Sequence, residues 1–331
     1  MTQMPTRPSM DRPVSVFITG ANGFIGRALT IRLRETGCQV SGVDVKANPE
    51  GGIAAGNTGD PSGWSDLLAG VDVVIHTAAI VSNAAPLDRA WEVNVLGTQR
   101  VLGAAVAQGV PRFVHLSSIA AYGFDFPDGV DETYPVRVNG FSYTDTKVNS
   151  EAVVLAAHAA REIKCTIIRP ADVYGPRSNP WIVLPLQMIK EGKLVLPNGG
   201  NGVFSPVYID NLVDGMLLAL SSDAAVGQIF ILGDGYGVTC ADYFGRLAAM
   251  AGGKVRTLPT RAAIALANVM GFAQRRTGHA SELNTATVLM LNRPGTYSIG
   301  KARKLLGYEP VVTLDDGMRQ VEAWARSKGL I

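Results

Sequence analysis

The chain has 331 residues, of which 47% are hydrophobic and 18% are charged, and 30 basic against 28 acidic side chains leave a formal net charge of +2. This composition is ordinary for a globular protein, and the length suffices for one large or two small domains. Because no block of like charge stands out, nothing indicates binding to nucleic acid or to an anionic membrane surface.

The first residues, 1–12, are polar and rich in proline, and they lack the apolar run of a signal peptide. We therefore predict a flexible tail. No later stretch reaches the roughly 20 apolar residues of a membrane span, so we expect no integral membrane association. The three cysteines lie far apart, which fits a reducing, cytoplasmic location. Neither they nor the four scattered histidines have the spacing of a metal site, so we expect no metal.

Short apolar strands alternate with helices through the first half of the chain. The pattern predicts strands at 14–20, 38–45, 71–79, 112–118 and 164–170, and helices at 27–37, 90–109 and 143–162. Such alternation favours a parallel sheet that helices cover on both faces. The fold class that we predict is thus α/β, with a Rossmann-like, doubly wound parallel sheet.

The second half is less regular. A strand leading into a helix is predicted at 205–222 and a further strand at 227–235, whereas 237–331 is mostly helical. We therefore predict a dinucleotide-binding domain from 13–178 plus about 205–236. A smaller, mostly helical substrate-binding lobe would comprise about 179–204 and 237–331.

The stretch TGANGFIG places Gly20, Gly23 and Gly26 between the first strand and the first helix. In this position the first glycine permits a tight turn, the second lets a pyrophosphate approach the backbone, and the third lets the helix pack closely on the strand. The free N–H groups of the helix N-terminus attract the phosphates. The motif predicts a bound dinucleotide.

The second strand ends in Asp44, 18 residues after Gly26. A carboxylate at this position accepts hydrogen bonds from the ribose hydroxyls of the adenosine half and repels a 2′-phosphate. Asp44 therefore favours NAD over NADP, although the neighbouring Lys46 weakens this preference.

The motifs occur in a fixed order that resembles the extended short-chain dehydrogenases/reductases. They are TGANGFIG, VD at 43–44, GD at 59–60, HTAA at 76–79, VNVLGT at 93–98, HLSSIAAYG at 115–123, Tyr143-x-x-x-Lys147 and RPADVYGP from 169. The resemblance covers nearly the whole chain. The C-terminal half, with RTLPTRAAIALANVMGFAQRR and LNRPGTYSIGKARKLLGYEP, looks most like the 3β-hydroxysteroid dehydrogenase branch.

The resemblance implies a role for each matching residue. The catalytic residues would be Ser118 (with Ser117 as the alternative), Tyr143 and Lys147, with Asn94 shaping the site. The cofactor would contact the loop residues Gly20, Asn22, Gly23, Phe24, Ile25 and Gly26, then Asp44, Asp60 (at the adenine amino group), Ala78, Ala79, Tyr143, Lys147, Pro170 and Val173. The substrate would contact Ser118, Tyr143 and Asp172. The resemblance further implies a homodimer formed by the helices at 90–109 and 143–162.

Tyr143 and Lys147 lie about one helical turn apart, so they share a face of the predicted helix. The hydroxyl of a tyrosine has an unperturbed pKa near 10. We expect the Lys147 ammonium and the positive nicotinamide ring to favour the phenolate, which lets Tyr143 act as acid and base near neutral pH.

Three functions remain open at this point. The first is an NAD-dependent oxidoreductase for a secondary alcohol or ketone on a hydrophobic, possibly steroid-like small molecule. The second is a nucleotide-sugar epimerase with tightly bound NAD, although Phe204 and Ser205 stand where epimerases carry Arg-Asp, leaving Arg293 as the candidate phosphate ligand. The third is a non-catalytic dinucleotide sensor. It ranks last because a sensor would tolerate the loss of the Tyr or the Lys, and both are present. Dehydration is disfavoured because Ile119 and Ala120 replace the expected acidic pair.

Overall fold

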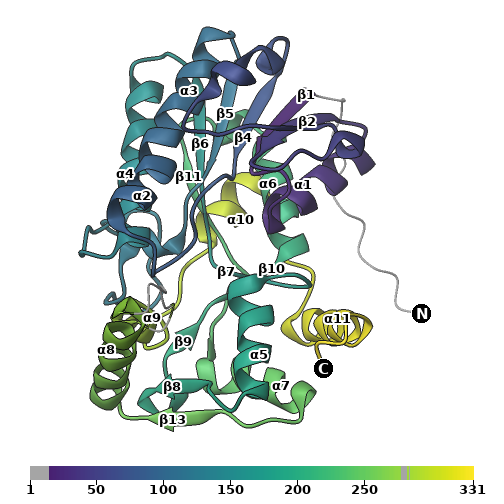
Figure 1. Cartoon of the computed structure of the whole chain (residues 1–331). Coiled ribbons are helices and arrows are strands. Elements are labelled where there is room, and N and C mark those ends of the chain that lie inside the picture. The colour runs from purple at the N-terminus through teal and green to yellow at the C-terminus, as the bar shows by residue number, and fades with distance from the viewer. Residues whose placement is uncertain (1–14, 277–281, 283) are drawn as a thin grey trace.

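The computed structural model describes residues 15–276, 282 and 284–331, with side chains left undescribed for 270–276. The predicted tail, residues 1–12, lies outside this range. A large parallel sheet forms the upper part of the molecule and a smaller lobe forms the lower part (Figure 1).

Seven parallel strands form the sheet, in the order β11-β6-β5-β4-β1-β2-β3. Their bounds are Ser15–Thr19 (β1), Gln39–Asp44 (β2), Ile53–Ala55 (β3), Val73–His76 (β4), Arg112–Leu116 (β5), Lys164–Pro170 (β6) and Ile229–Leu232 (β11). The predicted α/β fold class is thus confirmed. The sequence analysis missed β3, because three residues are too few for a periodic pattern.

Helices cover both faces of the sheet (Figure 1). Helices α1 (Phe24–Glu35), α6 (Ile209–Ser221) and α10 (Gly300–Leu306) pack together on one face. Helices α3 (Gly97–Ala107) and α4 (Ser142–Ala159) lie side by side on the other. The homodimer expected on α3 and α4 stays a prediction.

The helix predicted at 90–109 is divided. It consists of α2 (Leu87–Trp91), a π-helical turn (Glu92–Leu96) and α3. A π-helical turn inserts an extra residue into the helix and occurs frequently at functional sites. Here it contains Asn94, whose side chain is buried.

The smaller lobe contains α5 (Leu184–Lys190), α7 (Cys240–Ala251), α8 (Thr260–Arg276) and α9 (Thr285–Met290). Short strands form three two-stranded sheets between and beside these helices: β7 (Asp172–Tyr174) with β10 (Pro206–Tyr208), β8 (Val195–Pro197) with β13 (Arg256–Leu258), and β9 (Val203–Phe204) with β12 (Val238–Thr239). Helix α11 (Leu314–Ser327) contacts β10, whereas α10, from the same C-terminal segment, packs against α6 and β11. The domain boundaries drawn from the sequence stay a prediction.

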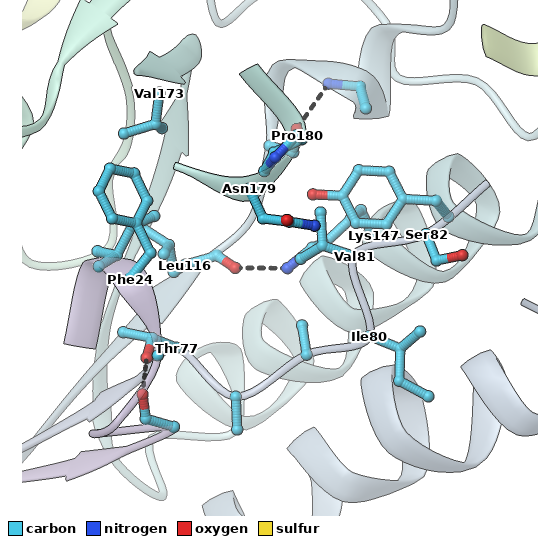
Figure 2. Close-up of a pocket in the computed structure, with 18 of the residues that line it drawn as sticks. Phe24, Thr77, Ile80, Val81, Ser82, Leu116, Lys147, Val173, Asn179 and Pro180 are labelled. Atoms are coloured by element: carbon cyan, nitrogen blue, oxygen red, sulfur yellow. Dashed lines mark hydrogen bonds between the residues drawn. The ribbon is translucent and has the colours of Figure 1, made fainter. Parts of the chain in front are cut away.

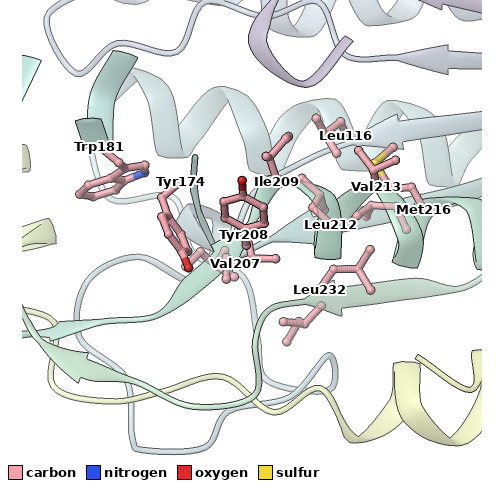
Figure 3. Packing of buried hydrophobic residues seen from close by; sticks show 14 of the residues in the cluster. Leu116, Tyr174, Trp181, Val207, Tyr208, Ile209, Leu212, Val213, Met216 and Leu232 are labelled. Atoms are coloured by element: carbon pink, nitrogen blue, oxygen red, sulfur yellow. The ribbon is translucent and has the colours of Figure 1, made fainter. Parts of the chain in front are cut away.

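One hydrophobic core connects the two parts. Figure 3 shows Trp181 and Tyr174 next to Tyr208, and the row continues through Leu212 and Met216 of α6. All five side chains belong to one buried cluster. The lobe is therefore held to the sheet by shared apolar packing. Along the described chain, no helix combines the length and the apolar character that crossing a bilayer requires.

A buried ion pair ties α4 to the sheet. The Arg169 guanidinium of β6 donates to both carboxylate oxygens of Glu151, over 2.8 and 2.6 Å. The Ser117 hydroxyl donates to the same carboxylate, and Arg169 also donates to the Tyr122 hydroxyl over 2.7 Å. Both charged side chains are 3% exposed. Buried charges are tolerated when their hydrogen bonds are satisfied in this way.

We predict that Glu151→Gln lowers the free energy of unfolding by about 3–5 kcal/mol, because it leaves the Arg169 charge buried without its counterion. The matched control is Glu322→Gln, which breaks the exposed pair with Arg326 and should cost no more than about 1 kcal/mol. Urea unfolding followed by circular dichroism measures both. Equal effects of the two substitutions would contradict this role of Glu151.

Candidate functional site

The glycine loop between β1 and α1 is shaped by close backbone contacts. Gly20 has φ +70°, and a Cβ there would lie 2.8 Å from the backbone of Ala78. A Cβ at Gly26 would lie 2.2 Å from the Gly20 carbonyl oxygen, so only glycine lets α1 pack this closely on the turn. The expected roles of Gly20 and Gly26 thus have a direct steric basis. Gly23, between them, is exposed and leaves the backbone accessible.

A cavity of about 790 Å³ begins at this loop and extends toward the smaller lobe. It opens at the carboxyl ends of the parallel strands, at the point between β1 and β4 where the strand order reverses. Ligands usually bind at this point in such sheets. Predicted site residues that line it are Gly20, Gly23, Phe24, Ile25, Gly26, Asp44, Ala78, Ala79, Ser118, Tyr143, Lys147, Pro170, Asp172 and Val173.

Tyr143 and Lys147 lie on the face of α4 that borders this cavity. The Lys147 ammonium donates a 2.8 Å hydrogen bond to the Leu116 carbonyl at the end of β5, as Figure 2 shows. The ammonium nitrogen lies 5.9 Å from the centre of the Tyr143 ring. Asn179 and Pro180 lie on the lobe side of Lys147 (Figure 2). The two side chains are thus brought together at the same wall.

Burial opposes the ionisation of both groups. It raises the pKa of Tyr143 to about 12, against the effect of the Ser118 hydroxyl, and the Asp172 charge raises it further. Burial also lowers the pKa of Lys147 to about 8, although the Glu151 carboxylate acts in the opposite direction. The expected lowering of the Tyr143 pKa is therefore not a property of the protein groups alone. A further positive charge is required beside the phenol.

The two candidate serines have different surroundings. Ser117 is 3% exposed, and its hydroxyl donates to the Glu151 carboxylate. Ser118 caps the short helix Ile119–Tyr122 by accepting a 3.0 Å hydrogen bond from the Ala120 N–H, and its hydroxyl also hydrogen-bonds to the Tyr143 side chain at the cavity. This geometry favours Ser118 over Ser117 for a contact with a substrate oxygen.

Asp44 lies at the end of β2 as expected. Its carboxylate oxygens accept hydrogen bonds from the backbone N–H groups of Asn22 and Val45, over 2.9 and 2.7 Å. The Asn22 side chain turns to the Lys46 carbonyl instead, and Asn22 does not line the cavity. The carboxylate is therefore held in place with acceptor capacity left for a ligand.

Two predicted residues act away from the cavity surface. Asp60 is exposed, and its carboxylate binds the N–H and hydroxyl groups of Ser62, whereas Asn57 and Thr58 line the cavity nearby. Its contact with the adenine stays a prediction that this arrangement does not support. Asn94 is 2% exposed and clamps the backbone of Ile80, accepting from its N–H over 2.7 Å and donating to its carbonyl over 3.0 Å. It positions the loop after β4.

Several lining residues were missed by the sequence analysis. The loop after β4 supplies Ile80, Val81, Ser82 and Asn83, and the segment after β7 supplies Arg177, Asn179, Pro180 and Trp181. Glu282 from the C-terminal part of the chain accepts hydrogen bonds from the Ser82 hydroxyl and the Asn83 N–H. The only signal for these residues was their position directly after predicted strands, where ligand-binding loops occur.

Asp172 and Arg293 form a second buried ion pair at the cavity wall. The carboxylate accepts from the Arg293 guanidinium and, over 3.0 Å, from the Ser205 N–H. The side chains are 5% and 4% exposed. We predicted that Asp172 contacts the substrate and considered Arg293 as a phosphate ligand. In the structure the two side chains pair with each other.

The residues present fit a nicotinamide dinucleotide. The glycine loop offers open backbone N–H groups at the start of α1, Asp44 offers acceptors for ribose hydroxyls, and Ala78 and Ala79 leave room between loop and sheet. Pro170 and Val173 line the same cavity, and Val173 lies near Phe24 of the glycine loop (Figure 2). When bound, the nicotinamide supplies the site at which a hydride is accepted or released.

Comparison with known proteins agrees with this geometry. Residues 16–233 match the NAD dependent epimerase/dehydratase family. A 3-beta-hydroxysteroid dehydrogenase from Mycolicibacterium neoaurum is 28% identical over 92% of this chain and 89% of its own length. A UDP-glucose 4-epimerase from Vibrio cholerae is 27% identical over 93% of this chain and 94% of its own.

The fold also matches that of a solved structure. A short-chain dehydrogenase/reductase superfamily protein from Agrobacterium tumefaciens, with NAD bound, superposes with a TM-score of 0.74 at 24% identity, covering 95% of this chain and 98% of that one. The family match spans the glycine loop, Asp44, Ser118, Tyr143 and Lys147. The chain is a member of the NAD-dependent epimerase/dehydratase family, an extended short-chain dehydrogenase/reductase and an oxidoreductase.

Proposed function

We propose that this protein transfers a hydride between NAD and a secondary alcohol or its ketone, with Tyr143 as acid and base. The observation that carries the proposal is the convergence of Ser118, Tyr143 and Lys147 in the cavity that begins at the glycine loop. An alcohol must lose its proton as its hydride departs, and the Tyr143 oxygen accepts that proton. The Ser118 hydroxyl stabilises the charge that develops on the substrate oxygen.

The positive nicotinamide ring would provide the charge that Tyr143 lacks. Burial keeps the phenol protonated in the protein alone. A cation close to the phenol favours the phenolate. Lys147, whose ammonium donates to the Leu116 carbonyl, would also bind the nicotinamide ribose and so fix the ring beside Tyr143. Cofactor binding would therefore activate the base.

The wall of the cavity beyond the cofactor supports an apolar substrate. Apolar side chains from the loop after β4, from the π-helical turn, from the segment after β5 and from the lobe share this wall: Ile80, Val81, Val93, Ile119, Phe124, Trp181, Leu184 and Met290. A cavity with apolar walls and a few polar groups binds a hydrophobic small molecule. The relative from Mycolicibacterium, named as a hydroxysteroid dehydrogenase, supports a steroid-like compound as one such substrate.

A nucleotide-sugar epimerase is the second candidate, and the relative from Vibrio cholerae supports it. A diphosphate binds best to a guanidinium that is free to form two hydrogen bonds. Arg293, the residue considered for this task, is buried against Asp172. This internal pairing favours an alcohol or ketone substrate over a nucleotide sugar.

We further propose a cytoplasmic homodimer. The free cysteines support the location, and the adjacent helices α3 and α4 support the dimer interface.

The function is tested by following nicotinamide absorbance at saturating NAD with a 3β-hydroxysteroid, simpler secondary alcohols and a UDP-glucose/UDP-galactose pair. We expect net NADH formation with a hydrophobic alcohol, because the hydride then stays on the cofactor. Interconversion of the sugars without net NADH would replace the proposal with the epimerase.

Tyr143→Phe should lower kcat by at least about 10²-fold, because the ring still packs but no proton is transferred. NAD affinity, measured by quenching of tryptophan fluorescence, should stay within a factor of about two, since one hydroxyl contributes little to a ligand of this size. The control is Tyr134→Phe, because Tyr134 does not line the cavity. Activity of Tyr143→Phe near that of the control would rule out Tyr143 as the acid and base.

Asp44→Ala should reduce the preference for NAD over NADP by about tenfold or more, because it removes charged hydrogen bonds to the ribose and the repulsion of a 2′-phosphate. The measurement is kcat/KM with each cofactor. Asp60→Ala serves as the control because Asp60 lies outside the cavity. An unchanged ratio in Asp44→Ala, or an equal change in Asp60→Ala, would remove Asp44 from the ribose.

A further inference from the structure

Among the described residues, four cationic side chains line the cavity, and Arg177 differs from the other three. It is exposed, and it forms no hydrogen bond or ion pair with any residue that the structure describes. Each of the others has a partner: Arg89 pairs with Glu92, Lys147 donates to the Leu116 carbonyl, and Arg293 pairs with Asp172. A guanidinium in this setting is available to a ligand.

The backbone of Arg177 is held in an unfavourable conformation. The Ser178 N–H donates to the Gly175 carbonyl over 3.0 Å, which closes a four-residue turn with Pro176 second and Arg177 third. Arg177 has φ +78°. A turn with proline second and a left-handed third residue is the type II arrangement, in which glycine or asparagine is preferred at the third position. An arginine there is strained.

The surroundings of the turn prevent relaxation. The Ser178 side chain is fully buried, and its hydroxyl donates to the Val173 carbonyl over 3.0 Å. A Cβ on Gly175 would lie 2.8 Å from the Ile209 side chain, so the start of the turn is closely packed. Val173 itself lines the cavity. Strain that packing maintains beside a site indicates that the side chain has a function there.

We infer that the substrate carries a carboxylate and that Arg177 binds it at the lobe side of the cavity, which makes Arg177 a residue that determines specificity. This inference rests on the proposed function and narrows its substrate class to hydrophobic hydroxy or oxo acids. The planar guanidinium matches a carboxylate through two parallel hydrogen bonds.

A carboxylate is favoured over a diphosphate because the charge available is small. Arg293 is neutralised by Asp172, and Arg89 is already paired with Glu92. One free guanidinium balances a single negative charge. A guanidinium also binds phosphate groups, so the experiment includes a phosphate probe.

The test uses the full-length protein at saturating NAD and isothermal titration calorimetry with octanoate, octanol and octyl phosphate. These probes share one chain and differ in the head group. The wild type should bind octanoate about tenfold more tightly than octanol, as expected for a charged hydrogen bond. Arg177→Gly should remove that preference, and Arg177→Lys should retain part of it because the charge remains without the planar fork.

Arg161→Gly is the matched control. Arg161 also has a positive φ, of 61°, but it follows α4 and does not line the cavity. Both glycine variants should keep or raise the melting temperature, since glycine adopts this conformation without strain. Only Arg177→Gly should lose the preference for octanoate.

Three results would overturn the inference: equal binding of octanoate and octanol to the wild type, an octanoate preference that persists in Arg177→Gly, or tighter binding of octyl phosphate than of octanoate. Because the titrations need no turnover, they are independent of the hydride-transfer assay. An octanoate preference that depends on Arg177 in a protein without dehydrogenase activity would contradict the proposed function alone.

Discussion

The buried pair of Glu151 and Arg169 is the interaction on which the site depends. Tyr143, Lys147 and Glu151 follow one another at four-residue intervals, so they lie on the same face of α4. Glu151 binds Arg169 of β6 and the Ser117 hydroxyl beyond β5, both under 4% exposed. Fixing this one carboxylate thereby fixes the helix that carries Tyr143 and Lys147 against the ends of the central strands.

The same arrangement carries an electrostatic cost. Lys147 is buried and Tyr143 is half-buried at the cavity wall, and this burial raises the pKa of Tyr143 to about 12 and lowers that of Lys147 to about 8. The protein groups alone therefore do not provide a phenolate near neutral pH. Under the proposed function, the positive ring of a bound dinucleotide would offset this effect. Cofactor binding and proton transfer would then be coupled.

The lobe supplies part of the cavity wall. Its apolar residues share a core with the sheet, so the cavity wall is built on a continuous packed interior. Within this wall, Asp172 neutralises Arg293, which removes the cation that a diphosphate would use. Arg177, presented by a strained turn, remains as a charge without a partner among the described residues. The two arginines have opposite roles because one faces an internal carboxylate and the other faces the cavity.

The parallel α/β sheet and the positions of the glycine loop, Asp44 and the Tyr143–Lys147 pair along the chain could be predicted from the sequence. These features are local, since they depend on apolar periodicity, on turn residues beside a strand, or on spacing within one helix. The short strand β3 and the π-helical turn at Asn94 could not, because neither produces a periodic pattern.

The remaining features of the site were decided by tertiary contacts. Ser117 and Ser118 are adjacent in the sequence, and tertiary contacts distinguish them, since Ser117 donates to Glu151 and Ser118 hydrogen-bonds to Tyr143. Arg293 and Asp172 are 121 residues apart, and nothing in either segment indicates that they pair. Asp60 lies outside the cavity because its carboxylate caps a local turn. The sequence by itself thus determined the fold and the cofactor loop through short-range patterns, whereas the partner of each buried charge was determined by long-range packing, which brings together groups that no local pattern relates.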